Sequence, residues 1–216
     1  MANISAMNKA NIDEFFRRLE EEDPDPKGEL HYVNPYTLVV AVALSAQATD
    51  IGVNKATRPL FEMVTTPQQM LDLGEARLKD YIKTIGLYNS KAKNVIKAAQ
   101  ILVDEFEGVV PETREDLEKL PGVGRKTANV VLNMAFGQPT IAVDTHLFRV
   151  GNRTGMAKGK TPLEVENKLL KKIPKHWLLH AHHWLILHGR YICKARKPDC
   201  AKCRVEDLCN FKAKAI

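Results

Sequence analysis

Four cysteines lie close together near the end of the sequence, and the chain has no other cysteine. Their spacing is Cys193-x6-Cys200-x2-Cys203-x5-Cys209, which places all four within 17 residues. A disulfide framework is typical of secreted proteins, and the N-terminus MANISAMNKANIDEFF lacks the apolar core of a secretion signal. The cluster therefore predicts a metal centre held by thiolates, around which the end of the chain folds.

The cysteine spacing leaves two kinds of metal centre open. Zinc sites usually combine two close CxxC or histidine pairs, and this segment has only the single CxxC of Cys200 and Cys203. Four thiolates in one short loop suit an iron–sulfur cubane. We therefore expect an iron–sulfur centre, with zinc as the alternative.

The remaining sequence has the hydrophobic periodicity of helices. Ile12, Phe15, Phe16 and Leu19 follow the i, i+3, i+4, i+7 pattern, and the apolar stretch from Pro35 to Ala48 predicts a buried helix. Further helices are expected over 50–63, 67–73, 75–85, 92–106, 114–120, 125–136, 144–152, 162–172 and 176–192. Thr140–Val143 predicts a short extended piece, and no convincing strand pattern is present. The prediction is an all-α fold.

Charge is distributed unevenly along the chain, whose formal net charge is +6. Residues 158–216 hold 14 Lys and Arg against 5 Asp and Glu, and the rest of the chain is net acidic. A basic C-terminal quarter predicts a polyanionic partner such as nucleic acid, with a solvated surface as the alternative. No apolar run reaches the roughly 18 residues that a membrane span needs, so we expect a protein inside the cell.

A tight turn, Leu120-Pro-Gly-Val-Gly124, joins two predicted helices. Gly122 and Gly124 can adopt backbone conformations closed to other residues, and the next helix begins at once with Arg125. Its unpaired N–H groups and positive dipole end suit a phosphate oxygen. The turn resembles a helix-hairpin-helix motif, and this resemblance implies binding of the DNA backbone by Gly122, Val123, Gly124 and Arg125, with a plain helix corner as the alternative.

Lys126 and Asp144 are the candidate catalytic residues. Lys126 lies in the first turn of the helix after the hairpin, where the dipole, neighbouring Arg125 and an expected partial burial all disfavour a charged amine. A neutral amine is what imine chemistry needs. Asp144 follows the extended piece at the start of another helix. The alternatives are a surface lysine that contacts phosphate and an aspartate that only caps its helix.

The run from Leu120-PGVGRKTANVV to Ile141-AVDTH-Leu-Phe-Arg149 resembles the endonuclease III family of helix-hairpin-helix DNA glycosylases. The resemblance covers Asn34 to Cys209, with Ser45-Ala-Gln-Ala-Thr-Asp50 and Gly86-Leu-Tyr-Asn-Ser90 as further matches. It implies an all-α, two-lobed fold with a C-terminal iron–sulfur cluster loop. One lobe would be a helical bundle over 29–138 with the hairpin. The other would combine 1–28 with 139–216 and carry the cluster.

The family resemblance also implies the chemistry. A bifunctional DNA glycosylase and AP (apurinic or apyrimidinic) lyase would flip an oxidised or ring-saturated pyrimidine out of the duplex. Lys126 would attack C1′ of the sugar and displace the base, and the resulting Schiff base would allow β-elimination that nicks the strand. Asp144, from the other lobe, would stabilise positive charge on the sugar or help to deprotonate the lysine. Cys193, Cys200, Cys203 and Cys209 would hold a [4Fe-4S] cluster.

Three more residues are candidate DNA contacts through the resemblance. Gln47 would pair with the base left opposite the lesion, and Leu87 would act as an apolar wedge. The alternatives are a helix-end hydrogen bond for Gln47 and core packing for Leu87. His146 would contact a backbone phosphate or simply cap a helix.

The implied partner is double-stranded DNA that carries damaged pyrimidines or abasic sites. We expect a monomer in the cytoplasm of a prokaryote, associated with the nucleoid and with no membrane contact. Three rivals remain. An adenine glycosylase would share the cluster but lack the hairpin lysine, a non-enzymatic DNA-binding module would not need the pair of Lys126 and Asp144, and a zinc-binding regulator would not need iron.

Overall fold

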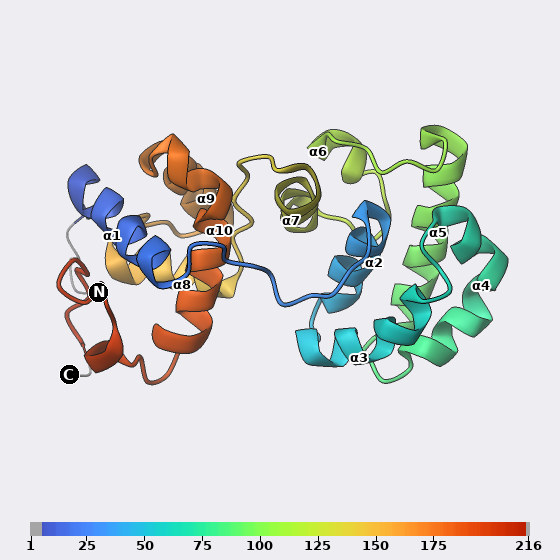
Figure 1. Ribbon diagram of the computed structural model, residues 1–216, viewed down its shortest axis with the longest axis horizontal. Helices are drawn as coiled ribbons and strands as arrows, with labels where there is room; N and C mark the ends of the chain where they lie inside the picture. The colour runs from blue at the N-terminus through green and yellow to red at the C-terminus, as the bar shows by residue number, and fades with distance from the viewer. Residues whose placement is uncertain (1–5, 215–216) are drawn as a thin grey trace. The chain divides into compact units, whose positions relative to one another are not determined.

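The structure, a computed structural model, describes residues 6–214, which divide into two compact units (Figure 1). Unit 1 takes the described residues of Met1–Gly28 and Gln138–Ile216, and unit 2 is Glu29–Gly137. Helices make up the regular structure of both units, and no strand occurs among residues 6–214. The prediction of an all-α fold is confirmed. No helix in this range is long and apolar enough to cross a membrane.

Unit 2 is built around one buried helix. Its helices are α2 (Pro35–Ser45), α3 (Asp50–Phe61), α4 (Pro67–Ile82), α5 (Tyr88–Phe106), α6 (Arg114–Leu117) and α7 (Arg125–Phe136). The α2 sequence PYTLVVAVALS is apolar on every side, and α3, α5 and α7 pack around it. Asn34 and Thr37 form a reciprocal capping box at its start, and Pro35 occupies the first turn. The buried helix predicted from Pro35 is confirmed, although it ends at Ser45.

The sequence predicts two irregular points in the helices of unit 2, one near Gly74 and one at Pro59. The predicted helices over 67–73 and 75–85 are joined as α4 across Gly74, whose φ of 77° and ψ of 161° interrupt the helical backbone. Helix α3 continues through Pro59 and ends at Phe61. Pro59 has no N–H to donate and removes one hydrogen bond of the helix, and α3 ends two residues later instead of reaching residue 63 as predicted.

Unit 1 combines the N-terminal helix with the last third of the chain. Its α-helices are α1 (Lys9–Glu22), α8 (Thr145–Thr154), α9 (Pro162–Lys172) and α10 (Leu178–Leu187). Phe15 and Phe16 of α1 are fully buried, and Phe16 lies against the rings of Trp177 and Trp184. Aromatic side chains bury large apolar areas, and this cluster joins α1 to α10.

The prediction of a single helix over 176–192 is wrong. The segment consists of a 3-10 turn at Lys175–Trp177, α10 and a π-helical turn at His188–Ile192. The wider π turn rotates the chain just before Cys193, and such turns are common at functional sites. Hydrophobic periodicity cannot separate these geometries, because all of them bury the same apolar residues.

Candidate active site and cysteine centre

The turn between α6 and α7 has the geometry of a backbone-binding hairpin. Gly122 has a φ of +86°, a conformation that residues with a side chain rarely adopt. Val123 is buried, and its N–H donates to the carbonyl of Leu120 at 2.9 Å. Gly122 and Gly124 are exposed on either side of it. The turn is therefore anchored by one apolar side chain and presents bare backbone to solvent.

Helix α7 begins with no side-chain cap. Its N-cap residue is Gly124, and an added Cβ there would meet nothing within 4 Å. Lys126 is the second residue of the helix, as predicted, but its side chain is exposed. The expected partial burial of Lys126 is wrong, because the open backbone at Gly124 leaves the first turn uncovered.

Asn94 supports the hairpin from α5. Its side chain lies under Gly122, and a Cβ on that glycine would come within 3.5 Å of both Cβ and Nδ2 of Asn94. The sequence analysis did not single out Asn94, since nothing in its local pattern indicates a contact with a turn almost 30 residues away.

Gln47 and Leu87 share an unusual backbone conformation. Among the described residues, only three other than glycine have a positive φ: Gln47 at 54°, Leu87 at 61° and Glu107 at 53°. A left-handed conformation costs a residue with a side chain roughly 1–2 kcal/mol. Gln47 is exposed, and Leu87 is 62% exposed. The exposed fraction of Leu87 contradicts the core-packing alternative.

Asp144 is the N-cap of α8. Its Oδ1 accepts the backbone N–H groups of His146 at 2.8 Å and Leu147 at 2.9 Å. Its Oδ2 lies 2.8 Å from Nδ1 of His146. The carboxylate is therefore held in one orientation by the start of the helix. Because Nδ1 of His146 is occupied by Asp144, Nε2 is the ring nitrogen that can bind another group.

A close approach between two segments fixes α8 in place. A Cβ on Gly189 of the π turn would lie 2.9 Å from Cβ of His146 and 3.2 Å from Cγ2 of Val150. Arg149 of α8 donates from Nε to the carbonyl of Cys193 at 2.9 Å and from Nη2 to the carbonyl of Gly189 at 2.7 Å. One helix thus has Asp144 as its N-cap and, through Arg149, contacts residues 193–209, which we call the cysteine segment.

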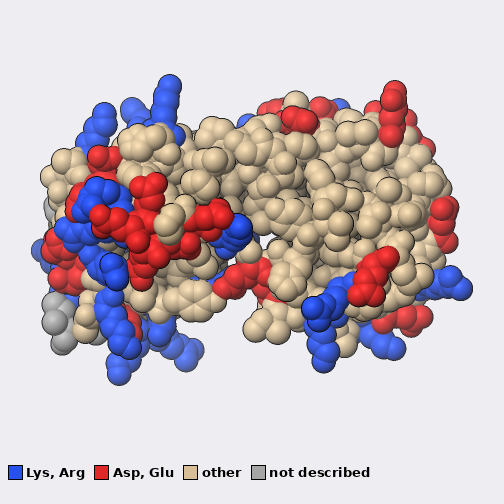
Figure 2. Space-filling model, viewed as in Figure 1, with Lys and Arg blue, Asp and Glu red and all other residues tan. Residues whose placement is uncertain are grey.

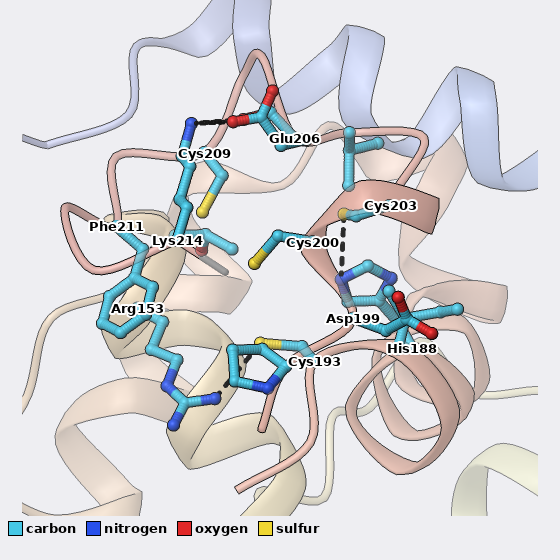
Figure 3. Close-up of a pocket in the computed structure, with 14 residues that line it drawn as sticks. Arg153, His188, Cys193, Asp199, Cys200, Cys203, Glu206, Cys209, Phe211 and Lys214 are labelled. Carbon is cyan, nitrogen blue, oxygen red and sulfur yellow. Dashed lines mark hydrogen bonds and ion pairs between the residues drawn. The ribbon is translucent and has the colours of Figure 1, made fainter. Parts of the chain in front are cut away.

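The four cysteines line one pocket of unit 1 and carry no disulfide (Figure 3). Their sulfur atoms face a common space, although they come from the π turn and the segment that follows it. Nε2 of His188 lies 4.0 Å from Sγ of Cys203, and Nη1 of Arg153 lies 3.7 Å from Sγ of Cys193. Nitrogen atoms therefore approach two of the four sulfurs.

The pocket is poorly solvated. Burial raises the pKa of the Cys203 thiol to about 11 and also raises the pKa of Cys209. Burial lowers the pKa of His188 to about 4, so this imidazole is neutral. Thiolates in such a place need a strong positive charge nearby, and the guanidinium of Arg153 and the amine of Lys214, which also line the pocket, supply part of it.

Arg153 clamps both ends of the cysteine segment. Its guanidinium donates to the carbonyls of Lys194 and Ala195, each at 2.6 Å, and lies 5.0 Å from the ring centre of Phe211. Lys194 and Ala195 are the two residues after Cys193, and Phe211 is the second residue after Cys209. Figure 3 shows Arg153 beside Phe211 and Cys193.

Arg18 of α1 holds the middle of the same segment. It donates to the carbonyl of Arg204 at 2.9 Å and pairs with the carboxylate of Asp207 at 2.7 Å. The sequence analysis missed Arg18, Arg149 and Arg153. The i, i+4 spacing of the two α8 arginines was a signal, because it places both on one face of that helix.

The predicted site residues fall into two groups. Unit 2 holds Lys126, Arg125, the hairpin, Gln47 and Leu87, whereas unit 1 holds Asp144, His146 and the four cysteines. Within unit 1, α8 connects Asp144 to the cysteine segment, because Arg149 donates to the carbonyl of Cys193.

Sequence comparisons identify close relatives. Residues 40–175 match the family model described as HhH-GPD superfamily base excision DNA repair protein. The chain is 61% identical over 208 residues to endonuclease III of Haemophilus influenzae, covering 96% of this chain and 99% of the relative. It is 60% identical over 208 residues to endonuclease III of Escherichia coli, with the same coverage.

Solved structures agree. A trapped endonuclease III–DNA covalent intermediate is similar with a TM-score of 0.87 and 46% identity, covering 94% of this chain and 95% of that one. A thermostable thymine-DNA glycosylase is similar with a TM-score of 0.80 and 26% identity over 93% of each chain. The chain therefore belongs to the endonuclease III family of the HhH-GPD superfamily, and it is a base-excision DNA glycosylase with AP lyase activity.

Proposed function

We propose that Lys126 is the nucleophile of this enzyme and that Asp144 is its charge-stabilising carboxylate. The observation that carries the assignment is the exposed amine of Lys126 in the uncapped first turn after the hairpin. A trapped covalent intermediate with DNA has been solved for a similar endonuclease III, and a covalent bond to DNA needs such a nucleophile. The substrates are duplexes that carry oxidised or ring-saturated pyrimidines, or abasic sites.

The reaction proceeds from an extruded nucleotide, because C1′ of the sugar is unreachable inside the stack. Nζ of Lys126 attacks C1′, the glycosidic bond breaks and the base leaves with its bonding electrons. Asp144 stabilises the positive charge that develops on the sugar. The sugar ring then opens to an imine with Lys126. Loss of a proton from C2′ expels the 3′ phosphate, and hydrolysis of the imine frees the lysine.

The hairpin and the two strained residues provide the DNA contacts in this proposal. Backbone N–H groups around Gly122, Val123, Gly124 and Arg125 hold a phosphate, and Nε2 of His146 binds another in this proposal. Exposed Gln47 and Leu87 fill the space left by the extruded base. Their left-handed conformations support this role, because strained backbone collects at functional sites.

The four cysteines fit a [4Fe-4S] cluster better than zinc. Among residues 6–214, no three His, Cys, Asp or Glu side chains lie close enough to hold one metal ion. Tetrahedral zinc would need four sulfurs within about 2.3 Å of one point, whereas a cubane takes one thiolate for each iron. The cluster would supply a structural cross-link, since base removal moves no electrons. Broad absorbance near about 400 nm would identify it, and a colourless zinc protein would contradict it.

Borohydride trapping on a duplex with thymine glycol tests the catalytic assignment. The wild-type protein should nick the strand and form a covalent adduct, and Lys126→Gln should lose both by about a hundredfold or more. Arg125→Gln is the matched control, because it removes the neighbouring cation and should weaken DNA binding while leaving trapping intact. Trapping by Lys126→Gln at the wild-type level would overturn the proposal. Monomeric state and nucleoid association stay predictions.

A further inference from the structure

A cavity of unit 1 is lined by five lysines and lies outside the site described above. It has a volume of about 600 Å³ and lies between the start of α1, the loop after α8, and α9. The lysines that line it are Lys9, Lys158, Lys168, Lys171 and Lys172. No Asp or Glu appears among its described lining residues.

The lysines of this cavity have no carboxylate partners among the described residues. The amine of Lys168 donates to the carbonyl of Lys158, and the amine of Lys172 donates to the carbonyl of Met156 at 2.9 Å. These bonds fix the direction of two ammonium groups without neutralising them. Figure 2 shows basic side chains projecting beyond α9 at the edge of unit 1. Like charges gathered around one space repel one another, and a bound anion relieves that repulsion.

Helix dipoles explain only part of this arrangement. Lys171 and Lys172 lie in the last turn of α9, where cations are favourable. Lys9, however, is the first residue of α1, whose first turn contains no acidic residue. A cation at the positive end of a helix is unfavourable unless an anion is near. The cavity volume lies within the range typical of small-molecule sites, about 300–1,000 Å³.

We propose that this lysine cavity binds a chain of phosphate groups, separately from the catalytic site. Several ammonium groups around one cavity match a ligand with several closely spaced negative charges. Two sources have this chemistry, a free oligophosphate and the backbone of DNA beyond the lesion. Of these two, only the DNA backbone as ligand rests on the proposed function.

Calorimetric titration with sodium tripolyphosphate tests the cavity directly. Lys168→Gln combined with Lys171→Gln removes two exposed charges, and we expect about tenfold weaker binding, because a single exposed ion pair contributes little and two are lost together. Lys93→Gln with Lys97→Gln on α5 removes the same charge from exposed positions elsewhere and should leave tripolyphosphate binding unchanged. Circular dichroism verifies that both variants are folded.

Salt titrations of binding to an undamaged duplex identify the source of the phosphates. If DNA occupies the cavity, the cavity variant should lower the slope of log K against log salt by about 2. If the slope is unchanged while tripolyphosphate binding weakens, the ligand is a free oligophosphate. Absence of saturable tripolyphosphate binding, or equal weakening in the α5 control, would show solvated lysines only and overturn the proposal. Nicking assays run in parallel report on the catalytic site alone.

Discussion

Strained backbone occurs at both ends of α5, but only one of the two strained residues is a proposed DNA contact. Leu87 and Glu107 both have left-handed backbones and lie at opposite ends of α5. Replacing either one with glycine removes the conformational strain, partly offset by the entropy of glycine. We expect Leu87→Gly and Glu107→Gly each to stabilise the fold by about 0.5–1 kcal/mol, measured by urea unfolding.

The two variants should differ in activity. Leu87→Gly loses the apolar side chain that holds the strands apart, so kcat/KM on a damaged duplex should fall by about tenfold or more. Glu107→Gly changes only the C-cap of α5 and should retain full activity. If Leu87→Gly cleaves lesions as well as the wild type, the wedge role is wrong.

Asp144 combines a structural role with a proposed chemical one, and two substitutions separate them. Asn keeps an oxygen that can accept hydrogen bonds from the N–H groups of His146 and Leu147. The free energy of unfolding of Asp144→Asn should therefore differ from that of the wild type by no more than about 0.5 kcal/mol. Its glycosylase rate should still fall by about a hundredfold or more, because the charge is gone.

Asp144→Ala removes the cap as well and should lose about 1 kcal/mol of stability in the same urea unfolding experiment. Full activity in Asp144→Asn would show that the residue only caps α8. Single-turnover kinetics on a duplex with thymine glycol would detect that outcome, because they isolate the chemical step from product release.

At the level of elements, helices were predictable where glycine or proline marks their ends. Helices α7 and α9 have the predicted bounds, because Gly124, Gly137 and Pro162 mark their ends. The cysteine segment was predicted from spacing alone. The π turn at His188–Ile192 was not, since it depends on tertiary contacts such as Gly189 against α8. The exposure of Lys126 and the left-handed φ of Leu87 depend on backbone geometry that residue patterns do not encode.

Helix α10 gives the fold a dependence on pH. Neither ring nitrogen of buried His183 has a hydrogen-bond partner among residues 6–214, and burial lowers its pKa from 6.5 to about 4. The unfolded chain therefore binds this proton more readily, so stability is full above pH 6.5 and decreases as pH falls toward 4. We expect a loss of about 1–2 kcal/mol from His183 between pH 7 and 5.

Urea unfolding of His183→Gln at both pH values measures this contribution. The variant should lose less stability than the wild type between pH 7 and 5, whatever its stability at pH 7. His31→Gln removes an exposed histidine and should follow the wild-type profile. An unchanged pH profile in His183→Gln would show that this imidazole does not control the acid sensitivity.

For the whole molecule, the two units are stabilised by different means. Unit 2 surrounds one apolar helix, α2, and most of its buried side chains come from its helices, with others such as Val110, Leu120 and Val123 added from the turns. Unit 1 has an aromatic core whose edge is completed by the cysteine segment, through fully buried Val205 and partly buried Cys193, Cys203 and Leu208. That segment contains one short 3-10 turn at Cys200–Lys202 and otherwise little regular structure. Its order therefore depends on the proposed cluster and on arginines from α1 and α8.

Loss of the cluster should therefore destabilise one unit selectively. After removal of iron by a chelator, hydrogen exchange should rise in the cysteine segment, in the π turn and in α1 and α8, whose Arg18 and Arg153 hold the segment. Peptides of α4 and α5 should exchange as before, because these helices belong to unit 2, whereas the four cysteines belong to unit 1.

Arg153→Gln should weaken the same segment without removing a cysteine. It loses the bonds to Lys194 and Ala195 and the contact with Phe211, so the absorbance of the cluster should bleach several times faster under chelator. Arg196→Gln, which removes a charge from the same segment, is the control. Equal bleaching in both variants would mean that charge, and not the clamp from α8, retains the cluster. Uniform exchange across both units after iron removal would mean that the cluster stabilises the molecule as a whole.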